Sequence, residues 1–269
     1  MKKVILVTGA TDGIGLATAK RLVELGHRVL LHGRNEAKLE DAKKQLAELD
    51  SKAQIETYVA DLSVIEEVKA LATAVRSNHK QLDVLINNAG VYIVSEKVSV
   101  DGLDTRFVVN TIAPYLLTKE LLPLLGNSSR VINLSSAAQA PINPNNLTKP
   151  SNQSDGTVYA QSKLAITMWS RSLALSLKNT GPIIIAVNPG SMLGSKMVKE
   201  AYGVNGKDIQ IGSDILCRLA LNDEFNNATG KYFDNDSGQI TSPHPDALDS
   251  QKNQRVVDVI EAALANTLQ

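Results

Sequence analysis

Near its start the chain reads Val4-Ile5-Leu6-Val7-Thr8-Gly9-Ala10-Thr11-Asp12-Gly13-Ile14-Gly15. The consecutive apolar residues predict a strand buried on both faces, and the apolar periodicity of residues 14–25 predicts a helix directly after it. Because Gly9, Gly13 and Gly15 lack side chains, backbone amides and the positive helix terminus could approach a pyrophosphate closely. The alternative is a tight turn in which glycine serves only the backbone geometry.

Strand and helix patterns alternate along the first two thirds of the chain. Short apolar runs predict strands at residues 4–7, 28–31, 55–59, 84–86, 131–134 and 183–187. Amphipathic helices are predicted between them, at residues 14–25, 35–49, 63–78, 105–125 and 158–178. This alternation predicts an α/β fold with one doubly wound, Rossmann-type parallel sheet and helices on both faces. A helix at 208–221, a strand at 231–233 and a helix at 251–264 complete a single domain over residues 1–269.

Composition and charge exclude several classes of protein. Of the 269 residues, 43% are hydrophobic and 21% are charged, so we expect a globular chain rather than a disordered one. Lys plus Arg and Asp plus Glu both number 28, which leaves no net basic field for nucleic acid or anionic lipid. The single Cys217 and four scattered histidines predict neither a disulfide nor a metal site.

The apolar runs of the sequence predict neither a signal peptide nor a membrane span. The apolar run 4–7 is too short for the core of a signal peptide, and no stretch reaches the roughly eighteen apolar residues of a membrane span. We therefore expect a cytoplasmic protein with no membrane partner.

The second strand ends at Gly33 and Arg34, where ligands of such sheets lie. An acidic residue here would bind a ribose 2′-hydroxyl, whereas this chain offers a guanidinium that suits a 2′-phosphate. The pattern favours NADP(H), with NAD(H) still admissible. Arg34 could equally be a solvated surface residue.

The third and fourth strands also end in polar residues. Asp61 and Leu62 follow the third strand, and Asp61 could bond an adenine amino group or cap the next helix. Asn88, Ala89 and Gly90 follow the fourth strand, where Asn88 could instead satisfy turn amides.

Tyr159 and Lys163 lie four residues apart in a helical pattern and so share one face. An ammonium beside a phenol favours the phenolate, and lowering a tyrosine pKa from about 10 to neutrality needs about 4 kcal/mol. A buried cation together with a positive nicotinamide could supply it, although such pairs are usually surface contacts.

Hydroxyl and amide groups lie near the same edge. Ser135 and Ser136 end the fifth strand, and either hydroxyl could steady a developing oxyanion. Asn110 falls inside the preceding helix and could hold an ordered water. Each could also be a plain cap or packing residue.

Together these motifs resemble the short-chain dehydrogenase/reductase family over nearly the whole chain. The matching motifs are Thr8-Gly9 to Gly15, Asn87 to Gly90, Ser136, Tyr159 to Lys163, and Pro189-Gly190. The segment between Ser136 and Tyr159, with Gly230-Lys231-Tyr232-Phe233, looks like the retinol-dehydrogenase-like branch.

The resemblance implies hydride transfer between NADP(H) and a carbonyl or alcohol. It makes Tyr159 the general acid/base, while Lys163 lowers the pKa of Tyr159 and holds the nicotinamide ribose. Ser136, favoured over Ser135, positions the substrate oxygen, and Asn110 completes the set through a relay water. The residues expected at the cofactor are Gly9, Thr11, Gly13, Ile14, Gly15, Arg34, Asp61, Leu62, Asn88, Ala89, Gly90, Tyr159, Lys163, Pro189 and Gly190. Where the family usually has a threonine after Pro189-Gly190, this chain has Gly194 and Ser195.

The expected partner is a small-molecule carbonyl or alcohol, small to medium in size and partly apolar. Loops at about 137–157 and 191–208 should surround it, the second with Met192, Leu193, Met197, Val198 and Tyr202. Helices 105–125 and 158–178 commonly form a dimer interface in the family, which allows a homodimer or homotetramer. A second hypothesis is a non-catalytic, dinucleotide-sensing binding protein on the same scaffold.

Overall fold

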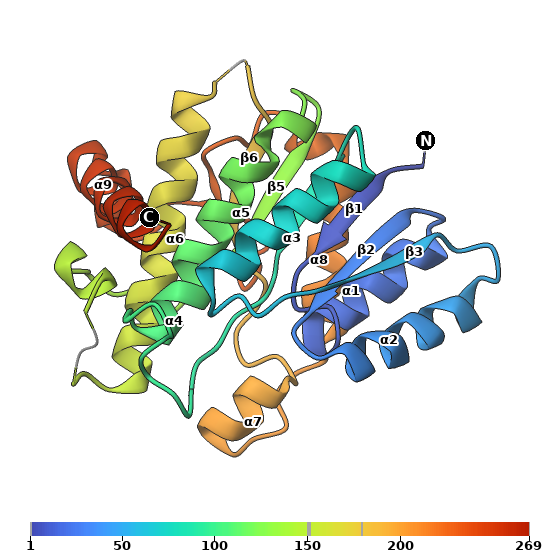
Figure 1. The fold of residues 1–269 in the computed structure, drawn as a ribbon, viewed down its shortest axis with the longest axis horizontal. Coiled ribbons are helices and arrows are strands. Elements are labelled where there is room, and N and C mark those ends of the chain that lie inside the picture. Colours follow the sequence, from blue (N-terminus) through green and yellow to red (C-terminus); the bar gives the residue numbers. More distant parts are fainter. Residues whose placement is uncertain (1, 150–151, 179, 269) are drawn as a thin grey trace.

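The computed structural model describes residues 2–149, 152–178 and 180–268. In these residues the strands form one eight-stranded sheet in the order β3-β2-β1-β4-β5-β6-β7-β8 (Figure 1). The strands are β1 (Val4–Val7), β2 (Arg28–Gly33), β3 (Ile55–Val59), β4 (Val84–Asn87), β5 (Arg130–Leu134), β6 (Ile183–Asn188), β7 (Tyr232–Asp234) and β8 (Gln239–Thr241). Neighbours pair in parallel, except that β8 runs antiparallel to β7. The predicted doubly wound parallel sheet is confirmed.

Helices cover both faces of the sheet. They are α1 (Gly13–Glu24), α2 (Glu36–Leu49), α3 (Ile65–Asn78), α4 (Thr105–Phe107), α5 (Ala113–Leu121), α6 (Asp155–Ser176), α7 (Lys196–Tyr202), α8 (Gln210–Leu221) and α9 (Ser250–Thr267). Alternate residues of β1 enter opposite cores, because side chains along a strand point to opposite faces. Ile5 and Val7 pack with α1, α2 and α8, whereas Leu6 packs with α3, α5 and α6.

The helix predicted at 105–125 is interrupted. It consists of α4, a π-helix over Val108–Ile112, α5 and a 3₁₀ turn over Leu122–Leu124. Apolar periodicity does not distinguish these windings, and Pro123 removes a backbone donor at the end of the helix. The prediction of one continuous α-helix was therefore wrong. Single-turn π-helices occur frequently at functional sites, and this one carries Asn110.

Two loop regions are more ordered than the sequence suggested. In the predicted loop 137–157, a 3₁₀ turn over Pro144–Leu147 buries Leu147 completely, and α6 already begins at Asp155. Residues 150 and 151 of that loop lie outside the described residues. The predicted loop 191–208 contains α7, which projects from the body of the protein at the bottom of the view in Figure 1. The unpredicted β8 is largely exposed and lacks an apolar run. None of the described helices is long and apolar enough to cross a membrane.

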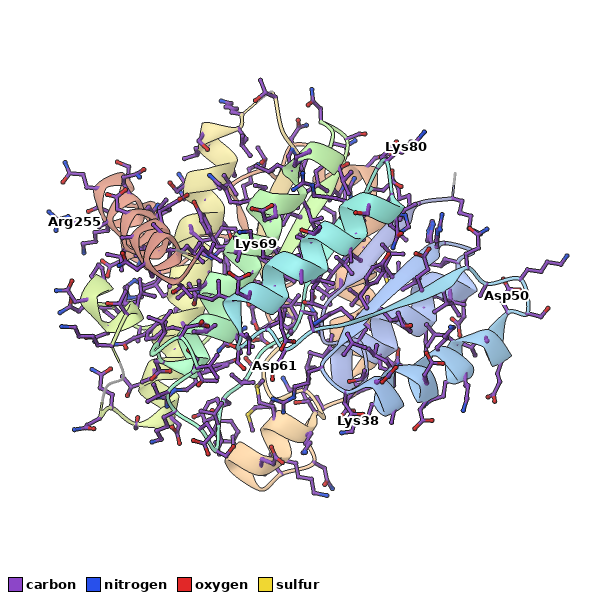
Figure 2. All side chains as sticks on the ribbon, in the orientation of Figure 1. Lys38, Asp50, Asp61, Lys69, Lys80 and Arg255 are labelled. Atoms are coloured by element: carbon purple, nitrogen blue, oxygen red, sulfur yellow. The ribbon has the colours of Figure 1, made fainter. Side chains whose placement is uncertain are left out.

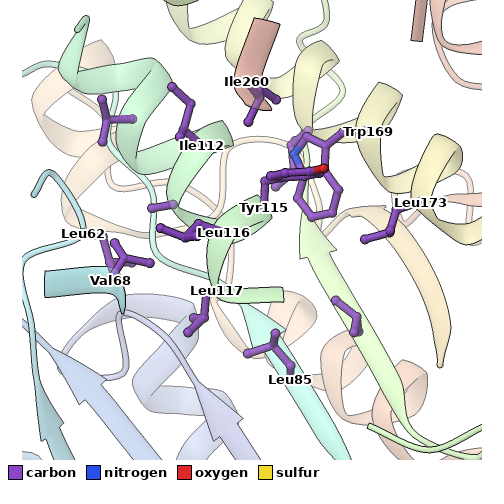
Figure 3. Packing of buried hydrophobic residues seen from close by; sticks show 14 of the residues in the cluster. Leu62, Val68, Leu85, Ile112, Tyr115, Leu116, Leu117, Trp169, Leu173 and Ile260 are labelled. Atoms are coloured by element: carbon purple, nitrogen blue, oxygen red, sulfur yellow. The ribbon is translucent and has the colours of Figure 1, made fainter. Parts of the chain in front are cut away.

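Helix α9 lies across α6 and completes one of the two cores (Figure 1). Its Ile260 is fully buried beside Tyr115 and Trp169, whose rings meet edge to face at 5.4 Å (Figure 3). The Tyr115 hydroxyl also donates a hydrogen bond to Glu261. Part of the α6 surface expected at a dimer interface is thus covered by this chain's own helix. The oligomeric state stays a prediction.

We predict that Ile260→Ala lowers the free energy of unfolding by about 2–5 kcal/mol, because it leaves a cavity against Trp169. Urea unfolding followed by tryptophan fluorescence measures the change. Arg255→Ala is the matched control, since Arg255 lies on the exposed side of α9 (Figure 2). Equal midpoints for the two variants would contradict the packing role of Ile260.

Candidate active site

A cavity of about 510 Å³ opens at the carboxyl ends of the central strands. Most residues expected at the cofactor line it: Gly9, Thr11, Gly13, Ile14, Arg34, Asp61, Leu62, Asn88, Ala89, Gly90, Tyr159, Lys163 and Pro189. Gly15, Gly190, Asn110 and Ser136 are not part of its lining. The structure therefore brings the sequence motifs to one place, with these four residues beside the cavity wall.

The glycine turn leaves no room for side chains. Gly9 has a φ of +64°, and a Cβ there would lie 2.9 Å from the Cα of Ala89. A Cβ at Gly15 would lie 2.3 Å from the carbonyl oxygen of Gly9. Gly15 thus serves close packing of α1 against the turn rather than direct contact with a ligand. The glycine turn and the N-terminus of α1 line the cavity, which fits a pyrophosphate.

Asn88 and Thr8 hold this turn in position. The Asn88 side-chain amide donates to the carbonyl oxygens of Thr8 and Gly9, at 2.8 and 3.1 Å. The Thr8 hydroxyl accepts hydrogen bonds from the backbone amides of Asn88 and Ala89. The sequence offered Asn88 as a residue that satisfies turn amides. Its side chain instead satisfies two turn carbonyl groups.

His32 is a residue of this site that the sequence analysis missed. Its Nδ1 accepts from the Gly9 amide at 3.3 Å, and its Nε2 lies 3.0 Å from the carbonyl oxygen of Ala60. Burial lowers the pKa of His32 to about 4, so the ring is neutral and can donate through Nε2. It links the glycine turn to the ends of β2 and β3. A lone histidine in an apolar strand gave no signal for this role.

Two cations lie at the end of β2. Arg34 and Lys38 are exposed and line the cavity, and their charged side chains make no hydrogen bond or ion pair with the described part of the chain. Lys38 lies at the start of α2, and Asp61 lies on the same edge of the sheet (Figure 2). A Cβ at Gly33 would lie 2.6 Å from the Thr11 methyl group, so a carboxylate side chain is excluded there. No sequence pattern pointed to Lys38.

Asp61 lines the cavity and also closes a local turn. Its Oδ1 accepts hydrogen bonds from the amide and hydroxyl of Ser63, at 2.9 and 2.7 Å. Its own amide donates to Glu67. The helix-cap role that the sequence offered for Asp61 is wrong, because the N-cap residue of α3 is Val64 and Asp61 instead closes a turn with Ser63.

Tyr159 and Lys163 line the cavity together with Ser135, and Ser136 lies beside its wall next to the Tyr159 phenol. The Lys163 ammonium lies 5.6 Å from the centre of the Tyr159 ring and donates to the carbonyl oxygen of Leu134 at 2.7 Å. The Ser136 hydroxyl hydrogen-bonds the Tyr159 phenol. Ser135 instead points into α6, where it bonds the Lys163 carbonyl and the Thr167 hydroxyl. The geometry separates the two serines that the sequence left adjacent.

Burial shifts the pKa values of both titratable groups in the chain alone. Burial raises the pKa of Tyr159 to about 12, and the Ser136 hydrogen bond offsets this only in part. Burial also lowers the pKa of Lys163 to about 8. The sequence assigns the lowering of the Tyr159 pKa to Lys163 together with a positively charged nicotinamide, and this stays a prediction; in the chain alone, desolvation is the largest influence on that pKa. A phenolate here needs a further positive charge.

Asn110 lies on the π-helix and bridges two segments. Its side chain exchanges two hydrogen bonds with the backbone of Val91, at 2.8 and 2.9 Å. It also donates to the Ser162 hydroxyl at 2.9 Å, on the turn of α6 between Tyr159 and Lys163. The wider π-turn places this amide between the loop after β4 and α6.

The segment after Pro189 contributes Ser195, Lys196 and Met197 to the cavity. The Ser195 hydroxyl accepts from the Val198 amide and caps α7. Leu193, expected to roof the pocket, is buried in the protein against Gly212. It anchors the segment instead.

Comparisons with known proteins agree with this geometry. A family model described as short chain dehydrogenase matches residues 3–203. The chain is 34% identical to retinol dehydrogenase 12 of Bos taurus, covering 90% of this chain and 80% of that protein. An uncharacterized protein from Mycobacterium paratuberculosis has 25% identity and a TM-score of 0.81, over 98% of this chain and 93% of that one. A short chain dehydrogenase from Shigella flexneri, complexed with NADP, has 27% identity and a TM-score of 0.69, over 87% and 97%.

The depressed pKa of Lys163 predicts a pH-dependent stability. Between about pH 8 and the ordinary lysine value of 10.5, the unfolded chain keeps a proton that the folded chain has lost, so stability rises with pH. Relative to Lys163→Met, the wild type should gain about 2 kcal/mol of unfolding free energy from about pH 8 to about pH 9.5. Urea unfolding at both pH values measures this. An exposed control, Lys44→Met, should show a constant difference, and a constant difference for Lys163→Met would contradict the prediction.

Proposed function

We propose that this chain, because it belongs to the short-chain dehydrogenase/reductase family and to its retinol-dehydrogenase-like branch, transfers a hydride between NADP(H) and a carbonyl or alcohol substrate. Family membership makes it an oxidoreductase that binds a nicotinamide dinucleotide and acts on a small molecule. The observation that carries the finer proposal is that Tyr159 and Lys163 line a glycine-lined cavity, with the Ser136 hydroxyl beside the Tyr159 phenol.

The cavity suits an extended dinucleotide. Its glycine turn would hold the pyrophosphate, Asp61 would face the adenine, and Lys163 would hold the nicotinamide ribose. Pro189 also lines the cavity and would contact the nicotinamide. Bound in this way, the cofactor supplies the hydride and, when oxidised, a positive charge.

Tyr159 is proposed to give its phenol proton to the carbonyl oxygen during reduction, and to accept it back during oxidation. Ser136 donates a hydrogen bond to the same oxygen and so holds the substrate against the phenol. The Lys163 ammonium favours the phenolate that remains. Asn110 keeps Val91 and Ser162 in place and can hold a water on the proton path from Lys163.

The preference for NADP(H) is proposed on two grounds. Arg34 and Lys38 provide two unpaired cations where the adenine ribose would lie, and Gly33 leaves no carboxylate to repel a 2′-phosphate. The similar protein from Shigella flexneri was solved with NADP. The cytoplasmic location stays a prediction.

The first test is oxidation of NADPH against a panel of aldehydes and ketones, with Tyr159→Phe beside the wild type. The variant should lose about 10²- to 10⁴-fold in kcat for any carbonyl that the wild type reduces, because the proton donor is gone. Its Kd for NADPH, measured by fluorescence titration, should stay within about twofold. Tyr58→Phe removes a hydroxyl far from the cavity and is the control. NADPH binding without turnover of any carbonyl would instead favour the dinucleotide-sensing protein.

The second test concerns Arg34. Arg34→Asp should lower the ratio of NADP to NAD affinity by about ten- to a hundredfold or more, since a charge-assisted phosphate contact is replaced by repulsion. Lys44→Asp changes the net charge equally on α2, the helix that follows Arg34, and should leave the ratio unaltered. An Arg34→Asp ratio equal to that of the control would remove Arg34 from the cofactor site.

A further inference from the structure

Residues 193–207 form a flap that leaves and rejoins the protein at one neck. The Gly194 amide donates to the Lys207 carbonyl at 2.7 Å, and the Lys207 amide donates to the Met192 carbonyl at 2.6 Å. Gly206 has a φ of +74°, and a Cβ there would lie 2.7 Å from the Met192 carbonyl oxygen. Close backbone contacts therefore fix the neck, while Leu193 anchors it in the protein.

Beyond the neck, the flap has little to hold it. None of the residues of α7 is buried, and the ion pair of Lys196 with Glu200 lies within the helix at exposed positions. In the described chain, Tyr202 provides the hydrogen bond and the ring contact that join α7 to the rest of the protein. Its hydroxyl lies 3.4 Å from that of Tyr92, and the two rings are 5.8 Å apart with a 60° tilt. Tyr202 is nevertheless 53% exposed, so this contact is accessible to solvent.

Tyr92 lies outside the flap and contacts residues of α6. Its ring centre lies 4.8 Å from that of Tyr159, at a tilt of 43°. A Cβ at Gly156 would lie 2.7 Å from the Tyr92 hydroxyl, so the first turn of α6 packs closely against Tyr92. The preceding residue, Val91, is the one that Asn110 holds with two hydrogen bonds. Tyr92 is thus fixed beside the phenol that we assign to proton transfer.

We propose that Tyr92 and Tyr202 form a positioning pair that holds the flap 193–207 closed over the entrance beside Tyr159, with Tyr92 as the fixed half and Tyr202 as the moving half. The catalytic consequence of this closure rests on the proposed function, whereas the closure itself is independent of that function. Tilted ring pairs and a hydroxyl contact of this kind are weak enough to open in the folded protein.

Closure by this pair has a specific consequence for the reaction. Met197 lines the cavity from the flap, so closure brings an apolar side chain over the bound carbonyl compound. Loosening the pair should therefore weaken retention of the substrate more than it slows proton transfer, because Tyr159, Lys163 and Ser136 all lie outside the flap. The expected signature is a rise in KM larger than the fall in kcat.

The direct test is amide hydrogen exchange across residues 196–206, measured without cofactor or substrate. Tyr202→Ala should speed exchange by about three- to tenfold, the range that corresponds to losing one aromatic pair. Tyr202→Phe keeps the ring contact and should lie between Tyr202→Ala and the wild type. Val204→Ala, an exposed apolar change in the same flap, is the control and should match the wild type. Exchange in Tyr202→Ala equal to that of the control would overturn the proposal.

A double-mutant cycle tests whether the two tyrosines act together. Tyr92→Leu should speed exchange as Tyr202→Ala does, and the double variant should exchange no faster than either single variant. Additive effects would overturn the pairing. On any carbonyl that the wild type reduces, Tyr202→Ala should raise KM about three- to tenfold with a smaller loss of kcat. A fall in kcat at constant KM would overturn the retention role. If the wild type reduces no carbonyl, the proposed function fails while the exchange result still decides the closure.

Discussion

The site depends on one close backbone approach, between Gly15 at the start of α1 and the carbonyl oxygen of Gly9. A Cβ at Gly15 would lie 2.3 Å from that oxygen, so any other residue would push the helix away from the turn. Asn88 bonds the same carbonyl from the end of β4, and His32 bonds the Gly9 amide from β2. The ends of three strands and one helix are therefore fixed together, and the shape of the cavity follows from that junction.

Burial at the inner end of this cavity opposes the charges that catalysis needs. Burial raises the pKa of Tyr159 and lowers that of Lys163. The protein alone therefore favours a neutral phenol and an ammonium that loses its proton more easily. The Leu134 carbonyl and the Ser136 hydroxyl offset only part of this cost. In the chain alone the Tyr159 phenol therefore keeps its proton, and a further positive charge beside it would favour proton release. The low dielectric that disfavours the resting charges also strengthens that attraction.

Some of this organisation is readable in the sequence and some is not. The strand runs, the glycine turn and the i, i+4 spacing of Tyr159 and Lys163 are local signals, and the structure places them as expected. The π-helix at Asn110 is invisible to apolar periodicity, because its residues fit an α-helix equally well. Lys38 and His32 have roles set by neighbours distant in sequence. The contact of Tyr92 with Tyr202 spans 110 residues and leaves no local pattern.

Helix α6 carries both Tyr159 and Lys163, yet its outer side is packed by α9, which begins more than seventy residues later. During synthesis on the ribosome, Trp169 and its neighbours therefore emerge long before Ile260 can cover them. The nascent chain must carry an apolar stripe on α6 through that interval, exposed to chaperones and to other chains.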